Sequence, residues 1–193
     1  MTIKEIDNLF IDLANKNDKI RYPAFKKLLK ITDKKVNWIY DKWFLLLEKI
    51  NSENSFQRSI GLTLLANLAK SDTENRIEKI LDEYLEHFQD EKFITARLCI
   101  QNVWRIAAAN IRAKKKIIDR LESSYHDNFH FKTHPNLIKQ DIIGSLIYIG
   151  ILTKDKNVIS LVESFIENEV DMKYQKVLRS IAAKSKADAE KIN

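Results

Sequence analysis

The sequence contains few of the residues that break helices or shape tight loops. Its 193 residues include three glycines, two prolines and one cysteine. Average usage would give roughly twenty glycines and prolines together in a chain of this length. The shortage leaves little material for β-hairpin turns, for glycine-rich loops that hold phosphates, or for disordered linkers. A β-sandwich, a doubly wound dinucleotide-binding domain and a P-loop nucleotidase are therefore disfavoured, and an almost uninterrupted series of helices is favoured.

The chain also lacks disulfide partners and long apolar runs. Its one cysteine, Cys99, excludes an intrachain disulfide, and its large aliphatic neighbours predict a buried thiol. The most apolar segment, 142–152, is shorter than the roughly 20 residues of a membrane span. Residues 1–7 contain acids and no apolar run, unlike a secretory signal. We therefore expect an intracellular, cytoplasmic protein without a membrane partner.

The net charge is +6 and is spread unevenly along the chain. Segments 1–50 and 111–193 each carry +4, whereas segment 51–110 carries −2. This excess permits an acidic partner or nucleic acid but requires neither. Lysines outnumber arginines by 25 to 8. Because abundant lysine, isoleucine and asparagine are also typical of an AT-rich genome, codon usage is an alternative explanation of the basicity.

Apolar residues recur every three or four positions along nearly the whole chain, which predicts helices. Several residues are suited to the ends of these predicted helices. Segment 71–74 fits a capping box, Asn110 separates two apolar stripes, and Pro135 suits a first helical turn. Ten predicted helices group into five pairs, which span about 3–31, 34–70, 74–109, 111–153 and 155–190. The fourth pair is the longest because it includes a polar and aromatic loop.

A helix pair that recurs about every 35–45 residues is typical of an α-solenoid. The second helices of the pairs also share a pattern, in which a polar or basic residue precedes a small and then a large aliphatic one. Segments 55–61 and 92–100 resemble parts of small HEAT-like bacterial proteins. The chain is similar to the HEAT/armadillo class over nearly its whole length. This resemblance implies an all-α superhelix of about five HEAT-like pairs, forming one domain, 1–193, that serves mainly as a binding surface.

Within this class, the chain is distantly similar to the bacterial DNA alkylation repair proteins, which have a similar length. That likeness implies a basic concave groove that presents Trp, Asp and Arg to damaged DNA. Trp38, Trp43 and Trp104 are available, but the Trp-rich and Arg-Arg motifs of that family have no match here. No catalytic residue is carried over, and the apolar stripes predict that the tryptophans lie in the core.

Basic residues at the starts of the predicted inner helices form a candidate binding site. A solenoid places equivalent positions in a row along its concave surface, about 10 Å apart. This row, which could meet phosphates or acidic side chains, consists of Arg21, Arg58, Arg97 and Lys139, with Lys176 as a further candidate. The alternative is that each cation pairs with an acid of its own or the next repeat. Free cations would favour nucleic-acid binding, and paired cations would count against it.

A second basic group lies on the predicted helix that follows Asn110. Its members are Arg112, Lys114, Lys115, Lys116 and Arg120. Such a patch would bind nucleic acid with an affinity that depends on salt and not on sequence. The alternative is a solvated helix face, which is the usual meaning of a charge run.

The polar loop of the fourth pair contains His126, His130 and His134, spaced i, i+4, i+8. On one continuous helix they would share a face, and histidines at this spacing can bind a transition metal. Pro135 disfavours helical geometry at His134, so the alternative is a solvated loop that contains histidines. The aromatic residues between them could contact a partner or cap the fourth pair.

No nucleophile elbow, phosphate loop or other catalytic or cofactor motif occurs in the sequence. We therefore expect no cofactor and favour a non-enzymatic scaffold that binds a protein or peptide on its concave face. The alternative is a nucleic-acid-binding HEAT-like protein that uses the basic residues above. The identity of the partner and the oligomeric state stay open.

Overall fold

The computed structural model describes residues 2–127 and 134–192, and this part of the chain is all-α, without strands. Its α-helices are α1 (Ile3–Leu13), α2 (Asp18–Thr32), α3 (Trp43–Ile50), α4 (Ser55–Leu68), α5 (Arg76–Lys79), α6 (Leu81–Glu86), α7 (Phe93–Asn102), α8 (Trp104–Ala109), α9 (Ile111–His126), α10 (Pro135–Leu152), α11 (Lys156–Glu167) and α12 (Met172–Glu190). Three 3₁₀ turns, η1 (Tyr40–Lys42), η2 (Ala69–Ser71) and η3 (His87–Gln89), lie between them. The prediction of an all-helical chain is confirmed.

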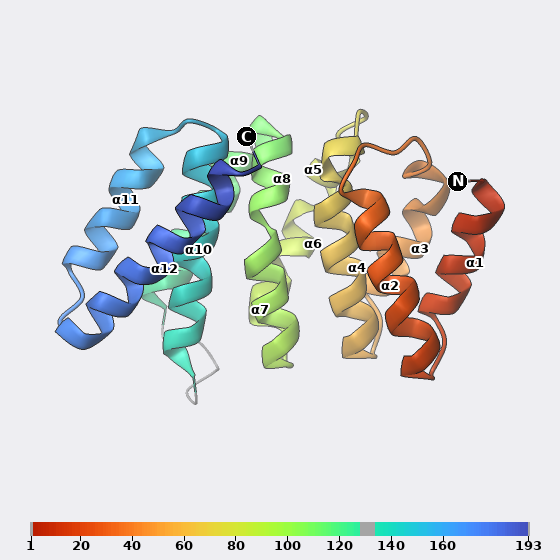
Figure 1. Cartoon of the computed structure of the whole chain (residues 1–193), viewed down its shortest axis with the longest axis horizontal. Helices are drawn as coiled ribbons and strands as arrows, with labels where there is room; N and C mark the ends of the chain where they lie inside the picture. The colour runs from red at the N-terminus through yellow and green to blue at the C-terminus, as the bar shows by residue number, and fades with distance from the viewer. Residues whose placement is uncertain (1, 128–133, 193) are drawn as a thin grey trace.

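The helices lie in two layers (Figure 1). In the layer nearer the viewer, named here the front layer, α2, α4, α7, α10 and α12 lie side by side, and α8 continues the line of α7. Within this layer α4 packs against α2 and α7, and α10 packs against α7 and α12. Helices α1, α3, α9 and α11 pack against α2, α4, α8 and α10, respectively, and join the two layers. The chain thus runs from one end of the molecule to the other, and most packing is between helices close in sequence.

The hydrophobic core lies between the two layers. Helices α1, α9 and α11 each bury one apolar stripe, whereas α4 and α10 bury residues on nearly every side. Each fully buried aliphatic side chain contributes about 1.5–3 kcal/mol relative to an exposed one. Trp38, Trp43 and Trp104 are at most 7% exposed, so the prediction that they lie in the core is confirmed.

Cys99 is buried, as predicted, and its thiol donates a hydrogen bond to the Tyr84 carbonyl at 3.3 Å. Burial raises the pKa of this thiol well above its usual range, so the thiolate that nucleophilic chemistry needs is disfavoured. Among the helices that the structure describes, none is long and apolar enough to span a bilayer.

Two of the predicted helix starts agree with the structure. Asn110 caps α9, because its side-chain oxygen accepts hydrogen bonds from the backbone N–H groups of Arg112 at 2.9 Å and Ala113 at 3.1 Å. Pro135 is the first residue of α10, where its missing N–H has no cost.

The capping box predicted at 71–74 is wrong, because the next helix begins only at Arg76. The Asp72 carboxylate accepts a hydrogen bond from the Tyr40 hydroxyl at 2.9 Å and another from the Ile77 N–H at 2.8 Å. Asp72 therefore links Tyr40 of the preceding helix pair to the first turn of α5. The Ser71 hydroxyl, which the box needs as its cap, instead accepts a hydrogen bond from the Val36 N–H at 3.0 Å.

Candidate ligand-binding face

The outward face of the front layer contains three hollows. The largest, about 750 Å³, lies between α2, α4 and α7 and is named here the apolar groove. A second, about 510 Å³, lies among the ends of α4 and α10 and helix α8, and is named the arginine hollow because Arg105 lines it. A third, about 380 Å³, lies between α7, α8, α10 and α12. Because ligands bind preferentially in concave places, this face is the candidate site.

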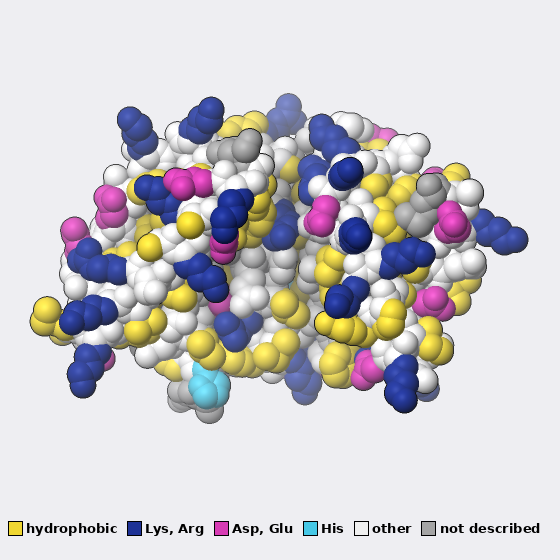
Figure 2. Space-filling view, in the orientation of Figure 1, with side chains coloured by type: hydrophobic (Ala, Val, Ile, Leu, Met, Phe, Trp, Pro, Cys, Tyr) yellow, Lys and Arg dark blue, Asp and Glu magenta, His cyan; other side chains and the backbone are white. Residues whose placement is uncertain are grey.

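The apolar groove exposes large apolar side chains to solvent. Tyr22, Phe56 and Ile94 line it and are 58%, 62% and 60% exposed. They come from three successive helices of the front layer, α2, α4 and α7. Figure 2 shows hydrophobic side chains gathered on the lower part of this face. A contiguous exposed apolar patch of this kind marks a binding surface.

Arg58, a member of the predicted basic row, is engaged in a buried ion pair. Its Nε and Nη2 donate to the two carboxylate oxygens of Asp90 at 2.7 and 2.8 Å. Its Nη1 donates to the carbonyls of Ser52 and Glu53 at 2.8 and 2.9 Å. The Arg58 side chain is 10% exposed and that of Asp90 3%. Arg58 therefore ties the start of α4 both to the turn before it and to the turn before α7.

Hydrogen bonding keeps this buried pair ionised. Burial by itself raises the pKa of the Asp90 carboxyl, but hydrogen bonds from Arg58, the Lys92 N–H and His87 outweigh it and hold the pKa below its usual range. Hydrogen bonding to Asp90 raises the pKa of Arg58 despite the opposing effect of burial. Each partner thus stabilises the charged form of the other.

Three further residues of the basic row are paired as well, whereas Lys176 on α12 has no acid within 4 Å among the described residues. They occupy the fourth or fifth position of α2, α7 and α10, as Arg58 does in α4. Arg97 donates two hydrogen bonds to the Asp141 carboxylate, at 2.6 and 3.0 Å. The Lys139 ammonium lies 3.6 Å from the Glu169 carboxylate. Arg21 pairs with Asp18 and donates to the Asn15 carbonyl at 3.1 Å. Three of the four pairs join one helix pair to the next. By the criterion set above, this pairing counts against a row of cations open to phosphates.

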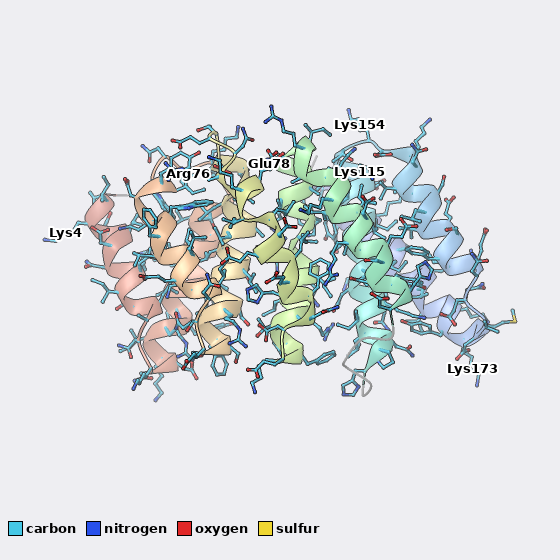
Figure 3. The ribbon with its side chains drawn as sticks, turned by 180° about the vertical axis from the view of Figure 1, so that it is seen from behind. Lys4, Arg76, Glu78, Lys115, Lys154 and Lys173 are labelled. Atoms are coloured by element: carbon cyan, nitrogen blue, oxygen red, sulfur yellow. The ribbon has the colours of Figure 1, made fainter. Side chains whose placement is uncertain are left out.

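The second basic group lies on α9, away from the front layer. Figure 3, seen from behind, shows Lys115 and Glu78 on this rear side. The three lysines of this group pair with acids: Lys115 lies 2.7 Å from Asp119, Lys114 lies 2.8 Å from Asp155, and Lys116 pairs with Asp82. Arg112 lies 3.9 Å from Glu78. Arg120 lies over the Phe88 ring. These contacts reduce the positive charge that a nucleic acid would meet there.

The described histidines of the predicted metal group contact aromatic rings. His126 is the last residue of α9, and its ring centroid lies 5.3 Å from that of Phe165. His134 precedes α10 and lies 5.5 Å from the Phe93 ring. His130 lies outside the described residues. Within residues 2–127 and 134–192, no three His, Cys, Asp or Glu side chains are grouped to hold a metal ion.

Arg105 on α8 is a candidate binding residue that the sequence reasoning missed. Its Nε and Nη1 donate to the side-chain oxygens of Asn67 at 2.8 Å and Asn102 at 3.2 Å, and its guanidinium lies 4.2 Å from the Trp104 ring centroid. No acid in the described part of the chain lies within 4 Å of it. Burial lowers the pKa of Arg105, in contrast to Arg58, whose pKa is raised by its acid.

The groove residues were also missed, although a signal was present. Tyr22 directly follows Arg21, and Phe56 and Ile94 lie two and three positions before the next two arginines of the row. Large apolar residues at the starts of successive helices, outside the buried stripe, could have indicated the groove.

No protein-family model matches the chain, and no curated protein matches its sequence. The described part of the chain is all-helical and has, on one face, an apolar groove and an arginine without an acid partner.

Proposed function

We propose that the chain is a HEAT-like α-solenoid of about five helix pairs that binds an amphipathic, acidic helical segment of a partner protein in the apolar groove. The alternation of helices between two layers supports the solenoid arrangement, because each repeat contributes one helix to each layer. The observation that carries the binding function is the exposure of Tyr22, Phe56 and Ile94 in one groove.

The shape and lining of the groove favour a helical partner segment. The groove follows α2 and α4, since residues 18–29 of one helix and 56–63 of the other contribute to its walls. An amphipathic helix laid along it would place apolar side chains at i, i+3, i+4 and i+7 against these walls. Docking would remove the exposed aromatic and aliphatic surface from water, and about 25 cal/mol is gained per Å² of apolar surface buried.

The charges around the groove favour acidic residues on the partner. Asp18, Lys19 and Arg21 line the groove, and Asp18 pairs with Arg21. The Lys26 ammonium lies 5.5 Å from the centroid of the groove-lining Tyr22 ring. No acid in the described ranges lies within 4 Å of the ammonium groups of Lys19 and Lys26. Unpaired cations beside an apolar groove steer and orient an acidic amphipathic segment.

The nucleic-acid alternative has weaker support. Four of the five residues of the basic row are paired with acids. The α9 group lies on the other side of the molecule and is largely paired too. Nucleic-acid affinity depends on cations that are available to neutralise phosphates. The exposed apolar side chains at the groove have no role in that mechanism.

The test is a selection of displayed random peptides, about 16 residues or four helical turns long, on the immobilised full chain. Selected sequences are expected to contain apolar residues at helical spacing and an excess of Asp and Glu. Binding of the synthesised peptides is then measured by fluorescence anisotropy. Phe56→Glu is expected to weaken their binding at least about tenfold, because docking would bury an unpaired carboxylate against apolar surface.

Phe44→Glu is the matched control, because Phe44 is a 75% exposed phenylalanine on α3, in the other layer. It is expected to leave peptide binding unchanged. The proposal is wrong if no peptide family is enriched, or if both variants bind the peptides as the wild type does. Binding of a DNA oligonucleotide at about 150 mM salt, unaffected by Phe56→Glu, would replace it with the nucleic-acid alternative.

A further inference from the structure

The arginine hollow has cationic donors in excess of its acids. Arg105 and Lys70 both line it, and Asp33 is the acid that lines it with them. The Lys70 ammonium donates to the backbone carbonyl of Asp33 at 2.9 Å rather than to a carboxylate. Among the described residues that line this hollow, two cations and one carboxylate leave a net charge of +1.

Both cations are partly removed from water. Burial is the main cause that lowers the pKa of Lys70 and of Arg105, and each is also affected by the Asp33 charge. The Nη2 group of Arg105 has no hydrogen-bond partner among the described residues, whereas Nε and Nη1 are held by Asn67 and Asn102. The two asparagines and the Trp104 ring thus position the guanidinium and leave one of its donor groups free.

The rest of the hollow is suited to a short apolar stem. Ala108, Ala109 and Leu152 line it together with Trp104. One negative charge would balance the site, and the Asp33 carboxylate would repel a second. A singly charged carboxylate on a methylene stem fits these walls better than a doubly charged phosphate.

The arginine hollow continues the line of the apolar groove along α4. Thr63 lines the groove and Asn67, one helical turn later, lines the hollow. Phe56 and Asn67 are eleven residues apart, which corresponds to about 16 Å along the helix axis. A single helical segment of about three turns can therefore contact both places.

We propose that the arginine hollow binds the carboxylate of an Asp or Glu side chain, carried by the segment that fills the apolar groove and located about three helical turns from its main apolar anchor. This inference rests on the proposed function, since it names a second contact of the same partner. A carboxylate can accept the free Nη2 donor of Arg105 and lie near the Lys70 ammonium.

A double-mutant cycle tests the pairing. The first change, in a selected peptide, replaces the Asp or Glu that lies about three helical turns from the main apolar anchor with Asn or Gln. The second change, in the protein, is Arg105→Gln. Either change alone is expected to weaken binding about tenfold, and the two together no more than one alone, because they remove the same contact. Arg179→Gln is the control, because Arg179 is an exposed arginine on α12 and its replacement removes the same charge. Additive losses, or an equal loss with Arg179→Gln, would overturn the inference.

A second measurement does not depend on the peptides. Butyrate, as a singly charged carboxylate probe on a short methylene stem, and inorganic phosphate are titrated into the ¹⁵N-labelled full chain, and the Trp104 indole N–H signal is followed. Butyrate is expected to give a saturable shift that Arg105→Gln abolishes and Phe56→Glu leaves intact.

The outcomes separate the two proposals. Peptides that depend on Phe56 but show no coupling to Arg105 would overturn this inference and leave the proposed function standing. Saturable butyrate binding without any selected peptide would retain the carboxylate site and reject the groove. Phosphate binding at least about tenfold tighter than butyrate would overturn the choice of a singly charged carboxylate.

Discussion

Replacing Asp90 with alanine is expected to lower the free energy of unfolding by about 3–5 kcal/mol, the usual cost of removing one partner of a buried ion pair. The Arg58 guanidinium would remain in a largely buried position with only the exposed Glu91 carboxylate, 3.4 Å from its Nη2, beside it. The Lys92 N–H, which donates to Asp90 at 2.8 Å, would lose its acceptor as well. Urea unfolding followed by far-UV circular dichroism measures the loss as a lower midpoint at an unchanged slope.

The matched control is Asp119→Ala, which breaks the exposed pair between Asp119 and Lys115 on α9. Exposed pairs of this kind contribute less than about 1 kcal/mol. The two alanine variants remove the same group and differ in burial, since the side chain of Asp119 is 56% exposed and that of Asp90 3%. Equal losses would contradict the interpretation of Arg58 as a structural link between helix pairs.

The same pair is expected to make stability depend on pH in acid. The pKa of Asp90 in the folded chain lies below the ordinary value of 3.8, so the unfolded chain takes up the proton first as the pH falls. The stabilisation is fully present above that ordinary value and is lost as the pH falls through the lower pKa of the folded state. The difference in unfolding free energy between the wild type and Asp90→Ala should therefore be constant near neutral pH and shrink below about pH 3.8. A difference that stays constant into acid would contradict this account.

The all-helical fold was predictable because the patterns that indicate each helix lie within that helix's own segment of the sequence. Helices α1, α9 and α11 bury one stripe each, and apolar periodicity reports such a stripe directly. Asn110 and Pro135 act on their own helices and were predicted at the right places. The capping box at 71–74 was predicted wrongly because the Ser71 hydroxyl accepts a hydrogen bond from the Val36 N–H of the preceding helix pair. Local chemistry therefore indicated the helices, and tertiary contacts changed some of their ends.

The candidate site was less predictable because its properties depend on partners distant in sequence. The positions of the basic row were visible, but the acid of Arg58 is 32 residues away and that of Arg97 is 44 residues away. Arg105 was hard to predict for a related reason, because only the folded structure shows that it has no carboxylate partner among the described residues. The exposure of Phe56 was hidden as well, since periodicity places apolar residues in the core by default.

Gly61→Val is expected to lower the free energy of unfolding by about 3 kcal/mol, because α4 lies too close to α3 at this residue to admit a side chain. A Cβ at Gly61 would lie 2.8 Å from the Lys49 Cβ and 2.9 Å from the Ile50 backbone nitrogen. The second of these atoms belongs to the backbone, so helix α3 as a whole has to move. Gly61→Ala is expected to lose about 1–2 kcal/mol, because overpacking outweighs the roughly 1 kcal/mol that alanine gains as a helix former.

Gly144→Ala on α10 is a control for which the expected change in the free energy of unfolding has the opposite sign. A Cβ there meets only the Ser185 hydroxyl oxygen, at 3.3 Å, and that side chain can rotate away. The higher helix propensity of alanine should then prevail, so this variant is expected to be as stable as the wild type or more stable by up to about 1 kcal/mol. Thermal and urea unfolding of the two alanine variants side by side measure the contrast. If Gly61→Ala were also neutral, the close approach of α3 and α4 would be wrong, and with it the reason for a glycine inside a buried helix.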